Sequence, residues 1–320
     1  MPSRLAPPAR LSDLPLPPLD LSIGPAPGRV VTVGGVDIHV RHAPRPDAEP
    51  ALLVHGLGGS TANWTDFAAL LGAKLDVESI DLAGHGRSGP AVNRGYSLAS
   101  HARMIVHYLE QSGRAPVHLV GNSMGGAISI LVASQRPDLV RTLTLISPAV
   151  PDVRLRIHPL KHDPRMGLIV VPGVGGMAMR RMSRLAVEAR VKGTLDVCFA
   201  DSSRYPEQRF DEAVDEARAR LQMPWANEAF VRSTRGLVRA QFLHGRAMWA
   251  AMRTLQAPTL VLWGDTDRLV APDLAGFVAA AIPDSRQLVL ERIGHTAMME
   301  DPLTSARAFF GLLEDVAASV

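Results

Sequence analysis

The sequence is poor in cysteine, since Cys198 is the only one among 320 residues. A single thiol cannot form an intramolecular disulfide, and it cannot supply the several thiolates of a usual structural zinc site. Its immediate neighbours in the sequence offer no base, so we expect Cys198 to be a buried or incidental thiol. Nothing here requires an oxidising compartment, and we expect a cytoplasmic location.

A long apolar run and a strong charge of one sign are also missing. The longest apolar run, 166–179, is too short to span a bilayer and contains Pro172 and four glycines. We therefore expect no transmembrane segment, while peripheral contact with a membrane stays open. The net charge is only +3 and no Lys/Arg block is long, so we expect no nucleic-acid partner. We also expect no secretory signal, because prolines interrupt the apolar stretch that such a signal needs. The sequence does not specify an oligomeric state.

Composition divides the chain into three parts. Residues 1–27 hold eight of the 25 prolines, so we expect an extended arm, either packed on the domain or disordered. After the arm, strand-length apolar runs alternate with segments of helical period, which is typical of a largely parallel sheet. The alternation stops at 149–256, where Arg- and Met-rich helical sequence takes over. We predict an α/β core at 28–148 and 257–320, with 149–256 as a helical cap insertion.

Strands and helices of the core can be placed from the same pattern. Gly34-Gly35 separates two short runs and predicts a hairpin with a two-residue turn. The six later runs are mostly β-branched residues and leucine, as expected of strands covered on both faces. Ser97 or Ser100 is a candidate cap for one helix, and the Asp-Pro pair at 301–302 begins another. The predicted strands are 29–33, 36–41, 51–54, 77–81, 117–120, 142–146, 259–263 and 287–290, and the predicted helices are 98–111, 124–134 and 303–313.

The strongest local motif is GNSMGG at 121–126, which follows a predicted strand and precedes a predicted helix. This is the G-x-S-x-G pattern, in which a sharp turn projects a serine hydroxyl into a cleft. Glycines beside the serine leave room for a strained backbone, and the N–H groups that begin the helix point to the same place. We predict Ser123 as a nucleophile, with Gly121, Asn122 and Gly125 shaping the site.

A serine hydroxyl is a weak nucleophile near neutral pH and needs a base, which itself needs an orienting acid. Both follow in the chain just beyond predicted strands, where open parallel sheets place their sites. His295 in GHT at 294–296 is the predicted base. The acid candidates, Asp265 and Asp267, stand in GDTD at 264–267.

A third element is HGLGG at 55–59, at the end of a predicted strand. Acyl transfer needs two N–H donors aimed at the developing oxyanion. The backbone amides of Leu57 and Met124 are the expected pair. We interpret His55 as a structural residue that shapes the loop together with Gly56.

Five motifs in this order resemble the α/β-hydrolase superfamily over residues 28–316. They are HGLG at 55–58, DLAGHGRS at 81–88, GNSMGG at 121–126, GDTD at 264–267 and GH at 294–295. The resemblance implies an α/β-hydrolase fold, with a mostly parallel sheet, helices on both faces and a helical cap. It also implies a serine triad that needs no metal and no organic cofactor.

The resemblance also assigns the remaining polar residues. The triad acid of this family usually stands three residues after the glycine, which selects Asp267 over Asp265. The triad is then Ser123, Asp267 and His295. Asp81 and His85 are implied to shape a loop beside the site rather than to react.

The residues of these motifs also exclude some of the reactions known in this superfamily. Epoxide hydrolases and haloalkane dehalogenases attack with an aspartate, so Ser123 excludes them. Asn122 and the MGG that follows Ser123 resemble hydrolases that cleave carbon–carbon bonds in ring-fission products. However, LGGS at 57–60 lacks the proline of their oxyanion loop, and Thr296 replaces their tryptophan. Hydrolysis of a carboxylic ester leads, with thioester hydrolysis as a branch and C–C hydrolysis as the alternative. A non-catalytic ligand-binding protein of this fold is less favoured because all three triad members are present.

The insertion bears on the substrate, a small or lipid-like acyl compound. An apolar run and several methionines predict an adaptable lining, with arginines beside it. One interpretation is a lid that admits an acyl chain and meets anionic lipid or a substrate carboxylate. The favoured one is a helix with an apolar core face and a solvated charged face, in which Trp225 and Trp249 are packing anchors. The residues concerned are 168–171, Met166, Met177, Met179, Met182, Met248, Met252, Arg180, Arg181 and Arg184.

Overall fold

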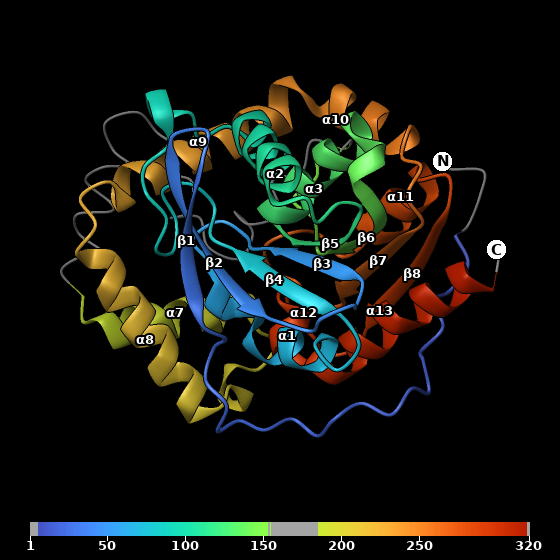
Figure 1. The fold of residues 1–320 in the computed structure, drawn as a ribbon, viewed down its shortest axis with the longest axis horizontal. Helices are drawn as coiled ribbons and strands as arrows, with labels where there is room; N and C mark the ends of the chain where they lie inside the picture. The colour runs from blue at the N-terminus through green and yellow to red at the C-terminus, as the bar shows by residue number, and fades with distance from the viewer. Residues whose placement is uncertain (1–5, 153, 155–184, 319–320) are drawn as a thin grey trace.

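The computed structural model describes residues 6–152, 154 and 185–318. In this part of the chain, eight strands form one sheet in the order β1-β2-β4-β3-β5-β6-β7-β8 (Figure 1). The β1–β2 and β2–β4 pairs are antiparallel and all other pairs are parallel. The strands are β1 Gly28–Val33, β2 Val36–Ala43, β3 Pro50–Val54, β4 Asp76–Ile80, β5 Val117–Asn122, β6 Val140–Ile146, β7 Thr259–Gly264 and β8 Ser285–Leu290.

All eight predicted strands are present, with ends that differ by at most three residues. The β1–β2 hairpin turns at Gly34 and Gly35, whose φ angles are +55° and +81°. Both angles are left-handed, which a two-residue type I′ turn requires and which glycine adopts without steric cost.

The three predicted helices are also present: α2 Leu98–Ser112, α3 Met124–Gln135 and α13 Pro302–Ala317. Ser97 is the cap of α2, since its hydroxyl accepts the N–H of Ser100 at 3.1 Å. Asp301 caps α13 by accepting the N–H of Thr304 at 3.0 Å. The helices α1 Thr65–Leu71, α11 Leu274–Ala281 and α12 Ala297–Glu300 were not predicted. They are too short to show a clear 3.6-residue period in the sequence.

Helices cover both faces of the sheet, each over its own apolar cluster (Figure 1). Along β5, Leu119 belongs to one cluster and Val120 to the other, because successive strand side chains point to opposite faces. The layer above the sheet contains α2, α3, α11 and α10 Gly245–Arg253, and the layer below contains α1, α12 and α13. The carboxyl ends of the central strands therefore meet at one edge of a sheet that is covered on both faces.

The insertion contributes α7 Val187–Cys198, α8 Glu207–Leu221 and α9 Ala226–Leu243. The predicted boundaries of the arm, core and cap stay a prediction. Met248 and Met252 are buried where α10 packs against α3 and α11, which agrees with the favoured interpretation of an apolar core face and not with a substrate lining. Trp249 lies in the same cluster and donates its indole N–H to the Pro151 carbonyl at 3.0 Å. The other predicted lining residues, 168–171, Met166, Met177, Met179, Met182, Arg180, Arg181 and Arg184, lie outside the described residues.

The proline-rich arm packs on the domain over its described residues, 6–27. Gln287 of β8 donates its N–H to the Pro7 carbonyl at 3.0 Å and accepts the N–H of Ala9 at 2.8 Å. Further along, the Ser12 N–H donates to the Arg307 carbonyl of α13. The arm then crosses the lower edge of the molecule toward β1 (Figure 1). Proline has no backbone N–H to donate, and the two arm residues that donate these bonds, Ala9 and Ser12, are not prolines.

Candidate active site

Ser123 occupies the turn between β5 and α3. Its backbone has φ 54° and ψ −118°, a conformation that non-glycine residues rarely adopt. The Ser123 N–H donates to the Ile146 carbonyl at 3.0 Å, which holds the turn against β6. Ser123 is partly exposed although Asn122 and Met124 on either side are buried. The turn therefore presents this one side chain from an otherwise closed backbone.

Two glycines are required by this turn. A Cβ atom at Gly121 would lie 2.5 Å from the Gly125 carbonyl oxygen, and one at Gly125 would lie 2.1 Å from the Val54 oxygen. Real Cβ atoms do not approach oxygen so closely, and backbone carbonyls cannot rotate away as side chains can. The glycines of the motif thus allow α3 to start directly against β3.

Asn122 connects the turn to the predicted base. Its side-chain amide donates to the carbonyls of Ile146 and His295, each at 3.1 Å. The residue before the nucleophile therefore fixes the backbone of a residue 173 positions further along the chain. Neither the motif nor its spacing predicts this bridge.

The structure brings Asp267 and His295 together. The His295 Nδ1 donates to the Asp267 carboxylate at 2.8 Å, and the two side chains are 4% and 0% exposed. The carboxylate also accepts the N–H groups of Leu269 and Val270 at 2.8 and 2.9 Å. Asp265, the other acid candidate, accepts the Arg292 N–H instead. Because an ionised carboxylate only accepts, Nδ1 carries the proton and Nε2 is left with its lone pair.

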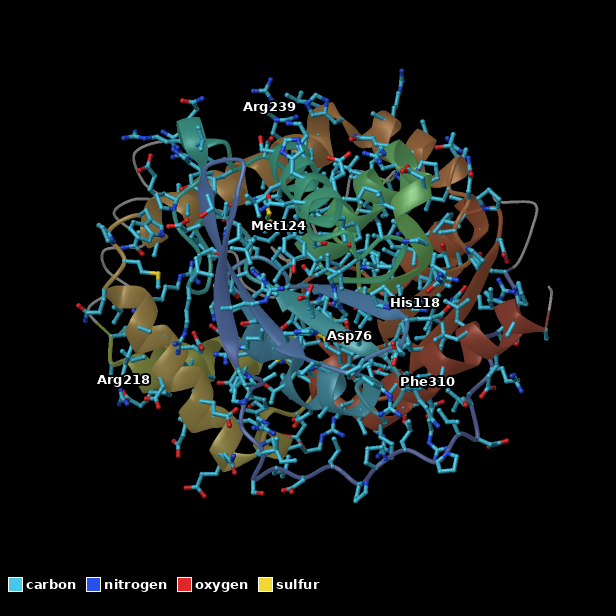
Figure 2. The ribbon with its side chains drawn as sticks, in the orientation of Figure 1. Asp76, His118, Met124, Arg218, Arg239 and Phe310 are labelled. Carbon is cyan, nitrogen blue, oxygen red and sulfur yellow. The ribbon has the colours of Figure 1, made fainter. Side chains whose placement is uncertain are left out.

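The loop after β3 packs against the nucleophile. A Cβ at Gly56 would lie 3.0 Å from the Ser123 Cβ. Across the described residues, no group accepts a hydrogen bond from the backbone amides of Leu57 or Met124. Figure 2 places Met124 in the interior, at the start of α3. Two unoccupied N–H groups beside a serine are what an oxyanion site requires.

His55 holds the shape of this loop. Its Nε2 accepts the Leu82 N–H at 3.0 Å, so the proton is on Nδ1, which donates to the Gly56 carbonyl at 2.7 Å. Burial lowers the pKa of His55 below its usual value, which keeps the ring neutral. With both nitrogens in use, His55 has none free for proton transfer.

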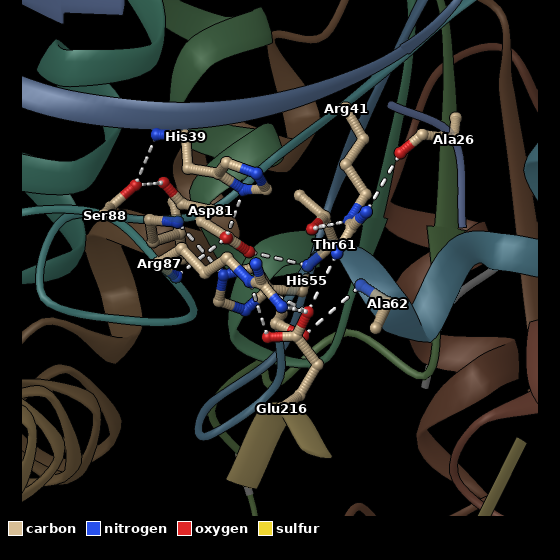
Figure 3. Close-up of polar contacts among 12 residues, drawn as sticks. Ala26, His39, Arg41, His55, Thr61, Ala62, Asp81, Arg87, Ser88 and Glu216 are labelled. Atoms are coloured by element: carbon tan, nitrogen blue, oxygen red, sulfur yellow. Dashed lines mark hydrogen bonds and ion pairs between the residues drawn. The ribbon is translucent and has the colours of Figure 1, made fainter. Parts of the chain in front are cut away.

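Asp81 is also fully engaged in structure (Figure 3). Its carboxylate accepts from the His39 ring at 2.8 Å, the Thr61 N–H at 2.6 Å and the Arg87 N–H at 2.9 Å. Burial alone would raise the pKa of Asp81, but the hydrogen bond from His39 and the charge of nearby groups lower it overall. Asp81 therefore stays ionised and ties together the loops on either side of β4.

Arg220 of α8 is a residue of this region that sequence reasoning missed. Its guanidinium donates to the Gly58 carbonyl at 3.0 Å and lies 5.7 Å from the Phe230 ring centroid. Burial lowers the pKa of Arg220 to about 10, and nearby Arg190 adds to this effect. The insertion thereby holds the carbonyl next to Leu57. An arginine in an Arg-rich helix carries no pattern that would single it out.

Glu300 is the second residue missed. Its side chain is fully buried and accepts the N–H groups of Gly294 at 2.7 Å, Ala200 at 3.1 Å and Asp201 at 3.3 Å. Arg204 pairs with the same carboxylate. Glu300 thus joins the residue before His295 to the segment that follows α7. Nothing in the sequence around position 300 marks this carboxylate as buried.

Four other features of the described residues lie outside this region or argue against a second reactive group. Among the described residues, no group of three or more His, Cys, Asp or Glu side chains could hold a metal ion. A cavity of about 400 Å³ lies between β1, β2, β4 and α2, and Ser123, Asp267 and His295 do not line it. Cys198 is only partly exposed, and the pKa of its thiol is raised to about 12 by burial and by nearby Asp267, which suppresses the nucleophilic thiolate. Within the described residues, no helix is both long enough and apolar enough to cross a membrane.

Comparison with known proteins places these features in one family. The model of the alpha/beta hydrolase fold matches residues 50–302. A monoacylglycerol lipase, abhd6-B of Xenopus laevis, is 27% identical over 282 residues, which cover 85% of this chain and 77% of that protein. A 2-hydroxy-6-oxononadienedioate/2-hydroxy-6-oxononatrienedioate hydrolase of Cupriavidus pinatubonensis is also 27% identical, over 84% of this chain and 86% of that protein.

Solved structures agree on the fold. A membrane phospholipase A described as a bacterial virulence factor superposes with a TM-score of 0.74 at 24% identity, over 91% of this chain and 86% of that one. The meta-cleavage product hydrolase of Pseudomonas fluorescens gives a TM-score of 0.70 at 19% identity, over 90% and 98% of the two chains. At these identities the likeness establishes the shared architecture.

Proposed function

Because this chain belongs to the α/β-hydrolase family, we propose that it is a serine hydrolase that cleaves a carboxylic ester through an acyl-enzyme intermediate. The observation that carries the proposal is the hydrogen bond from His295 Nδ1 to the buried Asp267, beside a strained and partly exposed Ser123. A base with a fixed tautomer and a presented hydroxyl are the two requirements of nucleophilic catalysis by serine.

The reaction has two halves. In the first, His295 Nε2 accepts the proton of Ser123 as Oγ attacks the ester carbonyl, and the same nitrogen then protonates the leaving alcohol. The Leu57 and Met124 amides donate to the oxyanion, and losing one such donor typically costs about 3 kcal/mol. In the second half, water activated by His295 attacks the acyl-enzyme and releases the acid. Asp267 orients His295 and stabilises its charged form throughout.

Ester cleavage is favoured by the relatives that act on acylglycerols or lipids, which include the Xenopus monoacylglycerol lipase and lipase 1 of Psychrobacter immobilis. A lipid-like acyl substrate follows from the same likeness. Hydrolysis of a thioester would use the same groups. C–C bond hydrolysis is the second candidate, because the Cupriavidus relative is a 2-hydroxy-6-oxononadienedioate/2-hydroxy-6-oxononatrienedioate hydrolase. A cytoplasmic location and a reaction without metal or organic cofactor stay predictions.

Turnover of p-nitrophenyl esters from acetate to palmitate by wild type, Ser123→Ala and Ser134→Ala tests the proposal. Ser134 lies in α3, where its hydroxyl donates to the Leu131 carbonyl, so its variant is a control for loss of a serine from the same helix. We expect kcat to fall at least about 10³-fold in Ser123→Ala and to stay near wild type in Ser134→Ala.

Fluorophosphonate labelling gives an independent readout. The wild type should become labelled and Ser123→Ala should not. Persistent labelling or turnover in Ser123→Ala would show that the nucleophile is another residue. A wild type that labels at Ser123, rejects every ester and cleaves a ring-fission dienoate would establish the C–C hydrolase instead.

A further inference from the structure

Beyond the first turn of α9, which contains the exposed Glu228, the charged side chains of α9 and α10 are all basic. From Ala229 to Gly264 the sequence contains five arginines and no Asp or Glu. Arg232 pairs with Glu228 at 2.8 Å, at the beginning of this segment. The other four, Arg235, Arg239, Arg246 and Arg253, have no ion pair with any described residue.

The arginines of α9 share a face of the helix with two apolar side chains. At 100° per residue, positions 232, 235, 239, 242 and 243 fall within an arc of about 100°. The buried residues of α9, Ala226, Ala229 and Ser233, lie on the opposite side. Figure 2 shows Arg239 at the edge of the molecule, directed away from the sheet. The arc therefore faces outward at Arg232, Arg239, Phe242 and Leu243, whereas Arg235 is only partly exposed and its Nε atom is buried.

Phe242 and Leu243 form the apolar end of this face. Their side chains are 54% and 66% exposed, although each is large and they are adjacent. Exposed apolar residues are common singly, but an adjacent pair within a basic rim is typical of an interaction site. α10 continues the rim, because its buried side holds Met248, Trp249 and Met252 and its outer side carries Arg246 and Arg253.

We propose that this basic apolar face, defined by Arg232, Arg235, Arg239, Phe242, Leu243, Arg246 and Arg253, docks on the surface of an anionic lipid bilayer. The guanidinium groups would bind lipid phosphates, and Phe242 and Leu243 would enter the boundary between headgroups and acyl chains. Each arginine near an anionic membrane contributes about fivefold to the affinity. A helix with a basic polar face and exposed Phe and Leu has the composition of interfacial helices.

A bilayer fits this face better than other polyanions do. The two side chains at the end of α9 have no polar atoms and could donate nothing to a nucleic-acid backbone or an acidic peptide. Insertion into lipid would remove both from water at once, which is favourable for any large apolar side chain. The proposal goes beyond ester hydrolysis and does not depend on the triad.

Vesicle flotation with the purified full chain tests it. Wild type should float with phosphatidylcholine vesicles that contain about 30% phosphatidylglycerol and not with phosphatidylcholine alone. The bound fraction should fall steeply when NaCl is raised from about 0.1 M to about 0.5 M. Arg239→Glu/Arg246→Glu should weaken binding by about 30-fold or more. Phe242→Ser/Leu243→Ser should weaken it by about tenfold or more.

Arg45→Glu/Lys74→Glu is the matched control, because both side chains are exposed, lie outside the face and change the net charge by the same amount. It should keep binding within about threefold of wild type. Absence of wild-type binding, or equal loss in the two charge-reversal variants, would overturn the proposal. So would an unchanged affinity of Phe242→Ser/Leu243→Ser.

Two further measurements separate this proposal from the proposed reaction. Ser123→Ala should float as well as wild type, and Arg239→Glu/Arg246→Glu should hydrolyse a water-soluble ester at the wild-type rate. Loss of flotation with Ser123→Ala would mean that lipid binding by the basic apolar face depends on the proposed active site. If the wild type floats with the vesicles but hydrolyses no ester, the lipid-binding proposal stands and the proposed enzyme function is wrong.

Discussion

The contacts within the sheet core differ in kind from the contacts that attach the helical insertion to the core. In the core, backbone meets backbone: α3 approaches β3 so closely at Gly125 that no side chain fits between them. The helix α8 of the insertion instead meets the core through charged side chains. Arg209 of α8 pairs with Asp66 of α1 at 2.7 Å, and Glu216 receives both Arg41 and Arg87 (Figure 3).

The contrast has a functional meaning. Catalytic geometry requires positions fixed to a fraction of an ångström, which close-packed backbone provides. A region that must admit substrates of varied shape needs attachments that open at lower cost. Arg220 and Glu300 connect the two regions, because each links the insertion to a loop of the site.

The largest effect is expected from Arg209→Ala. Arg209 is 4% exposed and binds Asp66, Glu212 and the Ile23 carbonyl of the arm, so its removal leaves two carboxylates without their partner. Breaking a buried pair from one side costs about 3 kcal/mol. Hydrogen exchange in α8 should become roughly 100-fold faster while β5 and β6 stay protected. Arg218→Ala, an exposed arginine of the same helix, is the control. Equal acceleration in the sheet would show that core and insertion open as one unit.

The core should instead respond to acid. Burial, with a further effect of His55, lowers the pKa of His101 from 6.5 to about 3, and neither ring nitrogen of His101 has a partner among the described residues. The folded state therefore binds its proton far less readily than the unfolded state, so stability is complete above about pH 6.5 and is lost as the pH falls toward 3. At pH 5 this one residue should lower the free energy of unfolding by about 2 kcal/mol.

Urea denaturation of wild type and His101→Leu between pH 7.5 and 5 measures this effect. The substitution leaves no partner unsatisfied, so the variant should show the smaller loss on acidification. Buried His85 and His55 also have lowered pKa values and would leave a residual slope in the same direction. Identical slopes in the two proteins would contradict the assignment.

The smallest effect probes the link between the regions. In Glu300→Gln one acceptor becomes an NH₂ group facing backbone N–H donors, which should displace the loop before His295. We expect kcat to fall about tenfold with little change in KM, because the loop carries the base rather than a substrate contact. The pH profile of kcat should also shift, which a loss of stability alone would not produce. Glu291→Gln is the control, because Glu291 is an exposed glutamate of the segment before His295. A change confined to KM would place Glu300 in substrate binding instead.

The sequence by itself determined the local structure of the core. Strand–turn–helix at 117–135, the hairpin at Gly34-Gly35 and the caps at Ser97 and Asp301 all depend on residues a few positions apart. The fold class and the likeness to the α/β-hydrolase family followed from such motifs in their order. Period and turn chemistry are properties of short segments, so a single sequence contains them.

Only the tertiary structure decided the rest. It used Asn122 to fix the His295 backbone, and it brought Arg220 and Glu300 to the site. It also buried Met248 and Met252 in the core, which decided between the core-face and substrate-lining interpretations for these two residues. Each of these contacts joins residues far apart in the chain, and no local period or spacing encodes which distant side chains fold together. The sequence names a carboxylate or a guanidinium in the same way whether the group is exposed or buried. Only the fold determines its burial and its partner.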